Sequence, residues 1–281
     1  MAALTGINDL FDRLTGNNSG TPETVFINKI PRVAGAVAST PAVGRPLSLW
    51  QFDGFPAGGA TPTAGEIPTL STTGAIPFTA AGGGREKWPI SLAAFTVNGG
   101  TFILYDRLYQ IGGLNGTLTT DQTVQGSTPS PALTRNTGGI GNFVFWEIYT
   151  AIGATATEIT MTYTNQAGTT GKTSQIFIGS STAQLAQRIQ RFPLATGDTG
   201  VQAVEKVKLT ASTGTAGNFG ITIGRPLAFL HINVTGAAGW RDITTGLPFT
   251  PIDNNACLAL LMIPNASTIP DLTMGMTFVE K

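Results

Sequence analysis

The chain has few of the residues that carry chemistry. Its 281 residues include one His, one Cys and only 11% charged residues, whereas a typical soluble domain has about 25%. The lone Cys257 can form no disulfide within the chain. His231 alone cannot supply the three or four ligands of a zinc site, and no nucleophile motif accompanies it. We therefore expect no metal, no cofactor and no enzymatic activity.

An excess of charge of either sign is also missing. Lys and Arg total 16 and Asp and Glu total 16, so the net charge is zero. Without a basic surplus to neutralise phosphates, we expect no nucleic acid partner. A chain near zero net charge is prone to associate with itself, so we expect a homo-oligomer.

Long apolar runs are absent as well. No window reaches the 18 consecutive apolar residues of a membrane span, so we expect no membrane partner. The segment MAALTGINDLFDRLTG lacks the basic start and continuous apolar stretch of a signal peptide.

One apparent nucleotide motif is incomplete. AGTTGKT at 167–173 resembles a phosphate loop, but Gln166 stands where that pattern requires its first Gly. The residues that follow, Ser174 to Phe177, form a strand pattern rather than the start of a helix. We interpret this segment as a tight hairpin turn and expect no nucleotide.

What the chain does contain is typical of a turn-rich β protein. There are 36 Gly and 17 Pro, with 41% hydrophobic residues to form a core. Alternation with period two predicts strands at 143–150 and 157–164, the second followed by a hairpin into 175–178. Asn98-Gly99-Gly100, between two apolar runs, predicts a further hairpin. Helices are predicted only at 5–15 and 181–191. The fold class predicted is all-β, an antiparallel β-sandwich or jelly-roll-like body with an extended N-terminal arm.

We predict two parts, an N-terminal segment over 1–46 and a β-sandwich body over 47–281. Ile7, Leu10, Phe11 and Leu14 fall on one face of a short helix that is not stable alone. Prolines at 31, 41 and 46 are typical of an extended arm. We expect the four apolar residues to bind a partner. The alternative is that the segment forms an ordinary edge strand and loops of the same body.

A charged cluster and several aromatic residues are further candidates for binding. GREKWP at 84–89 places Arg85 and Lys87 in a loop, which either is simply solvated or binds a partner. Trp50, Phe52, Phe55, Phe78 and Trp88 are interpreted as core-packing anchors, with sugar binding as the alternative.

In style of composition, the whole chain resembles virion proteins of tailed bacteriophages, most closely the capsid decoration or cement type. The features that carry the resemblance are the neutral Gly/Thr/Ala-rich sequence, the amphipathic N-terminal segment, the proline-punctuated arm and the Thr-faced strands. The resemblance implies a homotrimer located in the virion that bridges neighbouring capsid subunits, with the major capsid protein or other virion subunits as partners. The alternatives are a phage tail-tube subunit, another virion structural subunit, or a receptor- or carbohydrate-binding β module.

Overall fold

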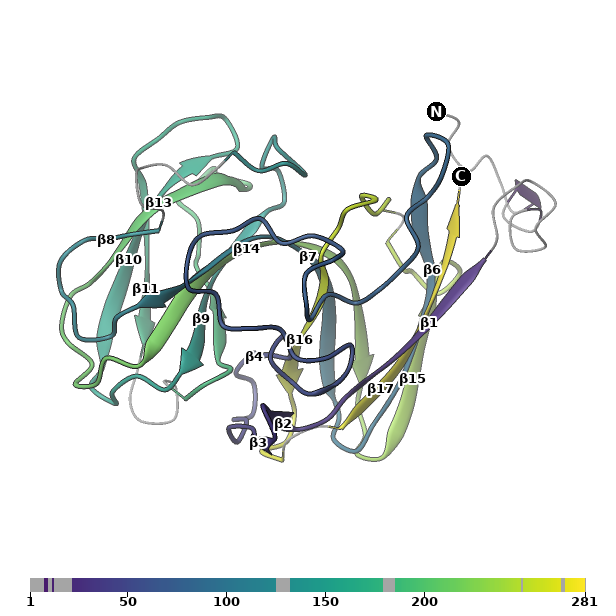
Figure 1. The fold of residues 1–281 in the computed structure, drawn as a ribbon, viewed down its shortest axis with the longest axis horizontal. Coiled ribbons are helices and arrows are strands. Elements are labelled where there is room, and N and C mark those ends of the chain that lie inside the picture. The colour runs from purple at the N-terminus through teal and green to yellow at the C-terminus, as the bar shows by residue number, and fades with distance from the viewer. Residues whose placement is uncertain are drawn as a thin grey trace.

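A computed structural model describes residues 8–9, 12, 22–124, 132–178, 185–248, 250–268 and 271–280. The protein is all-β, as the sequence predicts, and every strand pair in the described chain is antiparallel. Most strands belong to three sheets (Figure 1).

The five-stranded sheet has the order β15 (Ala237–Asp242), β6 (Lys87–Thr96), β17 (Leu272–Glu280), β1 (Glu23–Lys29) and β5 (Gly54–Phe55). The six-stranded sheet has the order β12 (Ile189–Arg191), β9 (Phe143–Thr150), β14 (Asn218–Ile232), β7 (Gly100–Leu114), β16 (Leu258–Pro264) and β4 (Leu47–Ser48). The four-stranded sheet has the order β11 (Lys172–Ile178), β10 (Thr157–Asn165), β13 (Val201–Leu209) and β8 (Gln122–Thr123). A small ribbon joins β2 (Arg32–Val33) to β3 (Ala36–Val37).

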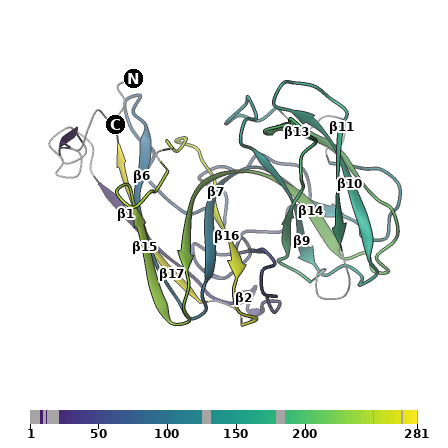
Figure 2. The same cartoon turned by 180° about the vertical axis from the view of Figure 1, so that it is seen from behind.

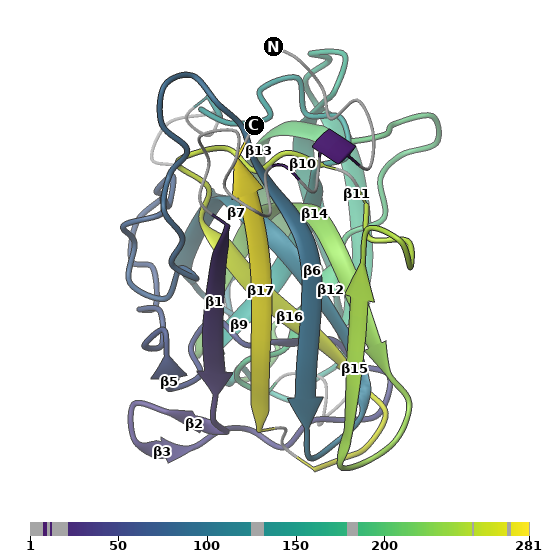
Figure 3. The same cartoon turned by 90° about the vertical axis from the view of Figure 1, so that its right-hand side faces the viewer.

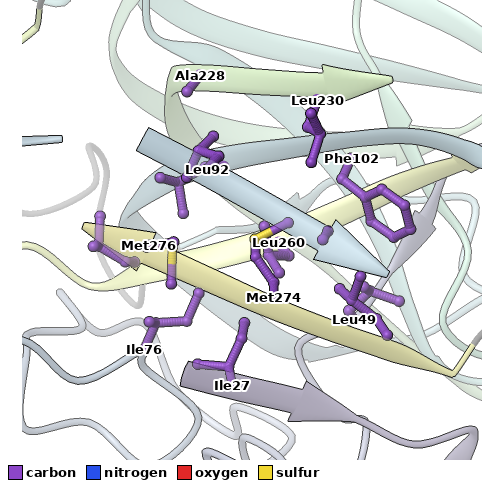
Figure 4. Packing of buried hydrophobic residues seen from close by; sticks show 14 of the residues in the cluster. Ile27, Leu49, Ile76, Leu92, Phe102, Ala228, Leu230, Leu260, Met274 and Met276 are labelled. Atoms are coloured by element: carbon purple, nitrogen blue, oxygen red, sulfur yellow. The ribbon is translucent and has the colours of Figure 1, made fainter. Parts of the chain in front are cut away.

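The six-stranded sheet lies between the other two and shares a hydrophobic core with each (Figure 1). The first core, against the five-stranded sheet, includes Leu92, Met274 and Met276 on one side and Phe102 and Leu260 on the other (Figure 4). The second core lies between the six-stranded sheet and the four-stranded sheet. Trp146, Phe219, Ile159, Met161 and Tyr163 are among its members.

Two long strands, β7 and β14, contribute to both cores. In β7, Phe102 and Leu104 belong to the first core, and Ile111 and Leu114 belong to the second. We call the part of the molecule around the first core one lobe and the part around the second core the other lobe. Figure 2 shows β14 curving from one lobe into the other. Because successive residues of a strand point to opposite faces, Tyr105 lies on the other face of β7 from Leu104, and it belongs to a third cluster with Trp50 and Phe145.

The strongest strand predictions are confirmed. The segment at 143–150 is β9, buried on both faces between β12 and β14. The segment at 157–164 lies in β10, where Ile159, Met161 and Tyr163 are fully buried. The hairpin that follows pairs β10 with β11, so residues 167–173 form its turn and the start of β11.

The predicted helix at 181–191 is wrong where the structure describes it. Ile189–Arg191 form β12, with Ile189 opposite Glu147 and Arg191 opposite Phe145. Residues 185–188 form no helix, and 181–184 lie outside the described residues. A helix of two turns is marginal in water, and here the open edge of β9 supplies backbone partners together with a buried position for Ile189.

The predicted hairpin at Asn98-Gly99-Gly100 is also wrong, although a tight turn is present. It connects β6 and β7, which belong to different sheets. A Cβ at Gly99 would lie 2.6 Å from the Ile232 carbonyl oxygen, and one at Gly100 would lie 2.7 Å from that of Ile263. The two glycines therefore permit a corner packed against neighbouring backbone, and the chain crosses from one layer to the next.

The segment over 1–46 is built into the body as far as it is described. β1 pairs with β17 over seven residues, from Glu23 opposite Phe278 to Lys29 opposite Leu272. Residues 22–46 thus form β1, the β2–β3 ribbon and loops of the same body. This agrees with the alternative that the sequence left open, except that β1 is not an edge strand, because β5 pairs with its other side. Asn8, Asp9 and Asp12 of the predicted helix at 5–15 are helical, and the rest of residues 1–21 lie outside the description.

Candidate functional site

The outer face of the five-stranded sheet carries an unusual set of exposed aromatic side chains. Figure 3 looks onto this face, with β1, β17, β6 and β15 in the foreground. One cross-strand row runs from Phe26 through Gly275 and Ala93 to Trp240. The adjacent row runs from Phe55 through Asn28, Thr273 and Phe95 to Ala238. The four aromatic residues therefore share one face.

Register places these aromatic residues in two pairs. Phe26 is diagonal to Phe55 across β1 and β5, and Phe95 is diagonal to Trp240 across β6 and β15. Diagonal partners are about 7–8 Å apart, within reach of aromatic rings. Gly275 lies between the pairs, and the Phe26 ring comes within 3.1 Å of the point where a Gly275 Cβ would stand.

The same face is strongly exposed and nearly uncharged. Relative exposure is 69% for Phe26, 53% for Phe55, 49% for Phe95 and 72% for Trp240. The other outward positions on the two rows are Gly, Ala, Thr and Asn. Single exposed apolar residues are ordinary on protein surfaces, but a contiguous apolar patch marks an interaction site. We call these residues the aromatic face: Phe26, Asn28, Phe55, Ala93, Phe95, Ala238, Trp240, Thr273 and Gly275.

None of the sequence patterns described above predicts this face. Its signal is three consecutive apolar residues in VFI, where a strand buries Val25 and Ile27 and must turn Phe26 outward. Recognising the full patch also requires the register of four other strands.

The predicted partner-binding residues fall into two groups. Ile7, Leu10, Phe11 and Leu14 lie outside the described residues, so their role stays a prediction. The prediction that Lys87 lies in a loop is wrong. Lys87 is buried at the start of β6, where its Nζ lies 3.0 Å from Glu23 Oε2 and 3.1 Å from Glu280 Oε1. These two ion pairs tie β6 to β1 and β17.

Arg85 is more accessible than Lys87. Its side chain is 35% exposed, and its Nη1 lies 3.5 Å from Glu280 Oε2. It lines a polar cleft of about 350 Å³ together with Asp106, Arg135 and Arg225. Arg135 donates to both carboxylate oxygens of Asp106 at 2.9 Å. Partner binding by Arg85 and Lys87 stays a prediction, and of the two only Arg85 is among the residues that line this cleft.

A buried ion pair connects two strands of the six-stranded sheet. Arg107 Nη2 on β7 is 2.6 Å from Glu147 Oε2 on β9, and both side chains are fully buried. The Glu147 carboxylate also accepts hydrogen bonds from Ser48 at 2.5 Å and Thr222 at 2.6 Å. Burial by itself raises the pKa of Glu147, but Arg107 and these hydroxyls outweigh burial and lower the pKa below its usual value. With its charges and hydrogen bonds satisfied inside the chain, the pair holds β4, β7, β9 and β14 together.

An apolar groove of about 490 Å³ lies beside this network. Ile103, Phe145, Leu261 and Ile263 are among its lining residues. Arg191 stacks over the Phe143 ring with 3.5 Å between the guanidinium carbon and the ring centroid.

Most of the large aromatic residues belong to the core. All four tyrosines are buried, as are Trp50, Trp146, Phe52 and Phe78. The core-packing interpretation of Trp50, Phe52 and Phe78 is therefore confirmed, whereas Phe55 belongs to the aromatic face.

Within the described ranges, no group of three or more His, Cys, Asp or Glu residues is arranged to hold a metal ion. The described part of the chain also has no helix with the length and hydropathy needed to cross a membrane.

Comparisons with known proteins give weak likenesses only. No protein-family model matches the chain, and no curated protein matches it. Among solved structures, it is similar to the VP2 subviral particle of infectious bursal disease virus, with 10% identity, coverage of 92% of this chain and 80% of that one, and a TM-score of 0.17. Infectious bursal virus derived T=1 particles give 8% identity, coverage of 93% and 79%, and a TM-score of 0.18. At such TM-scores nothing about the function of this chain follows from the likeness.

Proposed function

We propose that this protein is a structural virion subunit that decorates and cements a capsid by bridging neighbouring shell subunits. The observation that carries the proposal is the aromatic face. Its residues carry no charge, and it lies on the outside of a body in which the buried Lys87 and Arg107 form their ion pairs within the chain.

The size of the face fits a subunit contact. Aromatic side chains bury about 150–250 Å² each, so at the exposures of Phe26, Phe55, Phe95 and Trp240 these rings present roughly 500 Å². The smaller residues between them add to this area. A specific interface needs about 500 Å² or more from each partner, which the aromatic face supplies without a charged group.

The chemistry of the face favours a rigid apolar partner over a polar ligand. An uncharged surface offers no electrostatic steering, so its contact energy comes from apolar burial. A repeating shell presents the same partner surface many times, and subunits that bridge two copies gain from effective concentration. Modest contacts then suffice to hold a decorating subunit.

The test uses particles of the parent virus assembled without this chain. Purified protein is added and its binding is measured by co-sedimentation. The double variant Phe26→Ser/Trp240→Ser removes two exposed rings from opposite ends of one row. We expect it to keep the melting temperature of the wild type and to lose most particle binding.

Ile140→Ser is the matched control, because Ile140 is 67% exposed and lies in the other lobe. Full binding by the double variant would overturn the role of the aromatic face. Imaging of decorated particles locates the chain, and density on the tail in place of the shell would favour the tail-tube alternative over decoration.

A further inference from the structure

The outer edge of β11 is the longest open strand edge in the described chain. β11 pairs with β10 on one side, and no described strand pairs with its other side. Proteins protect such edges by keeping them short, or with charges, prolines or bulges. The outer strands β4, β5, β8 and β12 have two or three residues each. By contrast, β11 runs for seven residues without a proline, and it pairs with β10 without a bulge.

The remaining outer strand of the three sheets, β15, is protected in another way. It ends in the charged residues Arg241 and Asp242. The Asp242 N–H is already bonded to Thr245 Oγ1 at 2.8 Å, so part of this edge is occupied by the turn that follows it. The edge of β11 therefore differs from every other outer edge of the three sheets.

The pairing of β10 identifies the backbone groups at the open edge of β11. The Thr210 N–H donates to the Glu158 carbonyl oxygen at 2.9 Å, so the backbone groups of Glu158 face β13. Because this direction alternates along an antiparallel strand, the backbone groups of Ile159 face β11, where the partner is Ile176. The same alternation in β11 turns the N–H and C=O groups of three residues away from β10: Thr173, Gln175 and Phe177.

The side chains of these three residues are also open to a partner. Thr173, Gln175 and Phe177 are exposed, Phe177 to 62%. No residue from Thr173 to Ile178 is charged. The one charge on the strand is Lys172 at its start, where Nζ lies 4.0 Å from Asp198 Oδ1. A second, identical edge would therefore meet no like charge along the length of the contact.

We propose that two copies of this chain pair through β11, edge to edge and antiparallel, about a two-fold axis at Gln175. Gln175 then lies opposite Gln175 of the second copy, and Thr173 lies opposite Phe177. Each copy contributes three N–H donors and three carbonyl acceptors, so the pair forms six hydrogen bonds. Lys172 lies opposite Ile178, which keeps the two lysines at opposite ends of the contact.

This self-complementarity is the reason to assign a second copy as the partner. The outward groups are placed symmetrically about Gln175, so the edge matches itself without any change in register. The outer faces of the two four-stranded sheets stay on the same side and become one continuous surface. A two-fold contact uses the same patch on both copies and closes on itself, so association stops at a dimer. The homotrimer that the resemblance implies would need a different contact.

The experiment measures the mass of the full chain by sedimentation equilibrium at a series of protein concentrations. We expect the mass to rise from one chain to two and to stop there. Hydrogen exchange gives a second measurement at the same concentrations. The amides of Thr173, Gln175 and Phe177 should exchange more slowly as the dimer forms, since they acquire acceptors from the second copy.

Gln175→Pro removes the central donor from each copy and should abolish the dimer. Proline is tolerated on an edge strand where the missing N–H faces solvent, so we expect a melting temperature within a few degrees of the wild type. Gln175→Lys places two like charges opposite each other and should raise the Kd of the dimer about fivefold. Mixing it in equal amounts with Gln175→Glu should restore the dimer, because opposite charges then face each other. Thr120→Lys is the control, since Thr120 is exposed and precedes β8 at the other edge of the same sheet.

Three results would overturn the proposal. The first is a single-chain mass at every concentration, and the second is a trimer. The third is a dimer that Gln175→Lys and Gln175→Pro leave unchanged, which would place the contact elsewhere. If Gln175→Pro fails to fold, Gln175→Lys and its mixture with Gln175→Glu decide the question, because both change an exposed side chain and no hydrogen bond to β10.

Discussion

Lys29 shows what burial does to a single charged side chain in this protein. It lies at the end of β1, is 3% exposed, and donates from Nζ to the carbonyl oxygens of Phe52 at 3.1 Å and Pro56 at 2.7 Å. Burial lowers its pKa to about 8, although attraction to Asp53 opposes the shift. Carbonyl oxygens carry no full charge, so they compensate the ammonium only in part.

This pKa makes stability depend on pH in a defined window. Between pH 8 and 10.5 the unfolded chain holds the Lys29 proton and the folded chain releases it, so stability rises with pH. The free energy of unfolding of the wild type minus that of Lys29→Met should rise by roughly 3 kcal/mol across this window. Below pH 8 the difference should be flat. Urea titrations at a series of pH values measure it, and a constant difference up to pH 10.5 would contradict the prediction.

Glu147 shows how much of a single residue's environment can be predicted from the sequence. Alternation places Glu147 on a largely apolar face of β9, and the structure confirms that face. Its partner Arg107 lies 40 positions away, on a strand that does not even contact β9 directly in the sheet order. The pattern of one strand predicts burial, but the partner follows only from how distant strands assemble.

At the scale of elements, the position of β1 determines how many N-terminal residues can be deleted without removing a strand from the body. Val25 and Ile27 are buried in the first core, and β1 is paired on both sides, with β17 and with β5. Deleting residues 1–40 removes this strand from the inside of a sheet. Deleting residues 1–21 leaves every strand pair described here in place.

We expect the chain lacking 1–21 to melt within a few degrees of the full chain and the chain lacking 1–40 to be largely unfolded at room temperature. Circular dichroism melts compare the two. If the shorter deletion also unfolds, residues 1–21 belong to the core of the body. If it folds but no longer binds particles, the predicted role of Ile7, Leu10, Phe11 and Leu14 is supported.

The two wrong predictions of secondary structure have a common cause. At 181–191 and at 98–100 the local pattern is compatible with a helix and with a hairpin, respectively. The observed outcome depends on the open edge of β9 in one case and on the crossing between two sheets in the other. By contrast, β9 and β10 were predicted well because each carries its own two-residue alternation over eight or nine residues.

At the scale of the whole molecule, the two lobes share their central layer. β7 and β14 supply residues to both cores, so neither core survives without them. We therefore expect a single cooperative unfolding transition in place of two.

Variants in each core test this cooperativity. Ile159→Ala lies in the second core and Met276→Ala in the first. Each should cost about 2–5 kcal/mol and lower the one melting temperature by several degrees. Scanning calorimetry measures both, with the calorimetric and van't Hoff enthalpies equal. A thermogram in which Ile159→Ala moves only one of two peaks would show that the lobes unfold independently.

The pairing of β1 with β17 also bears on how the polypeptide can be rewired. Glu23 lies opposite Phe278, so the chain enters and leaves the five-stranded sheet at the same end, on adjacent strands about 5 Å apart. In a chain that lacks residues 1–21, a short linker from the end of β17 to the start of β1 would span that distance. The circle could then be opened in the β10–β11 turn, where Gly168 and Gly171 have positive φ. Such a circular permutant would keep the strand pairs described above while moving both termini to the opposite lobe, which makes the four-stranded sheet a place to attach a foreign peptide.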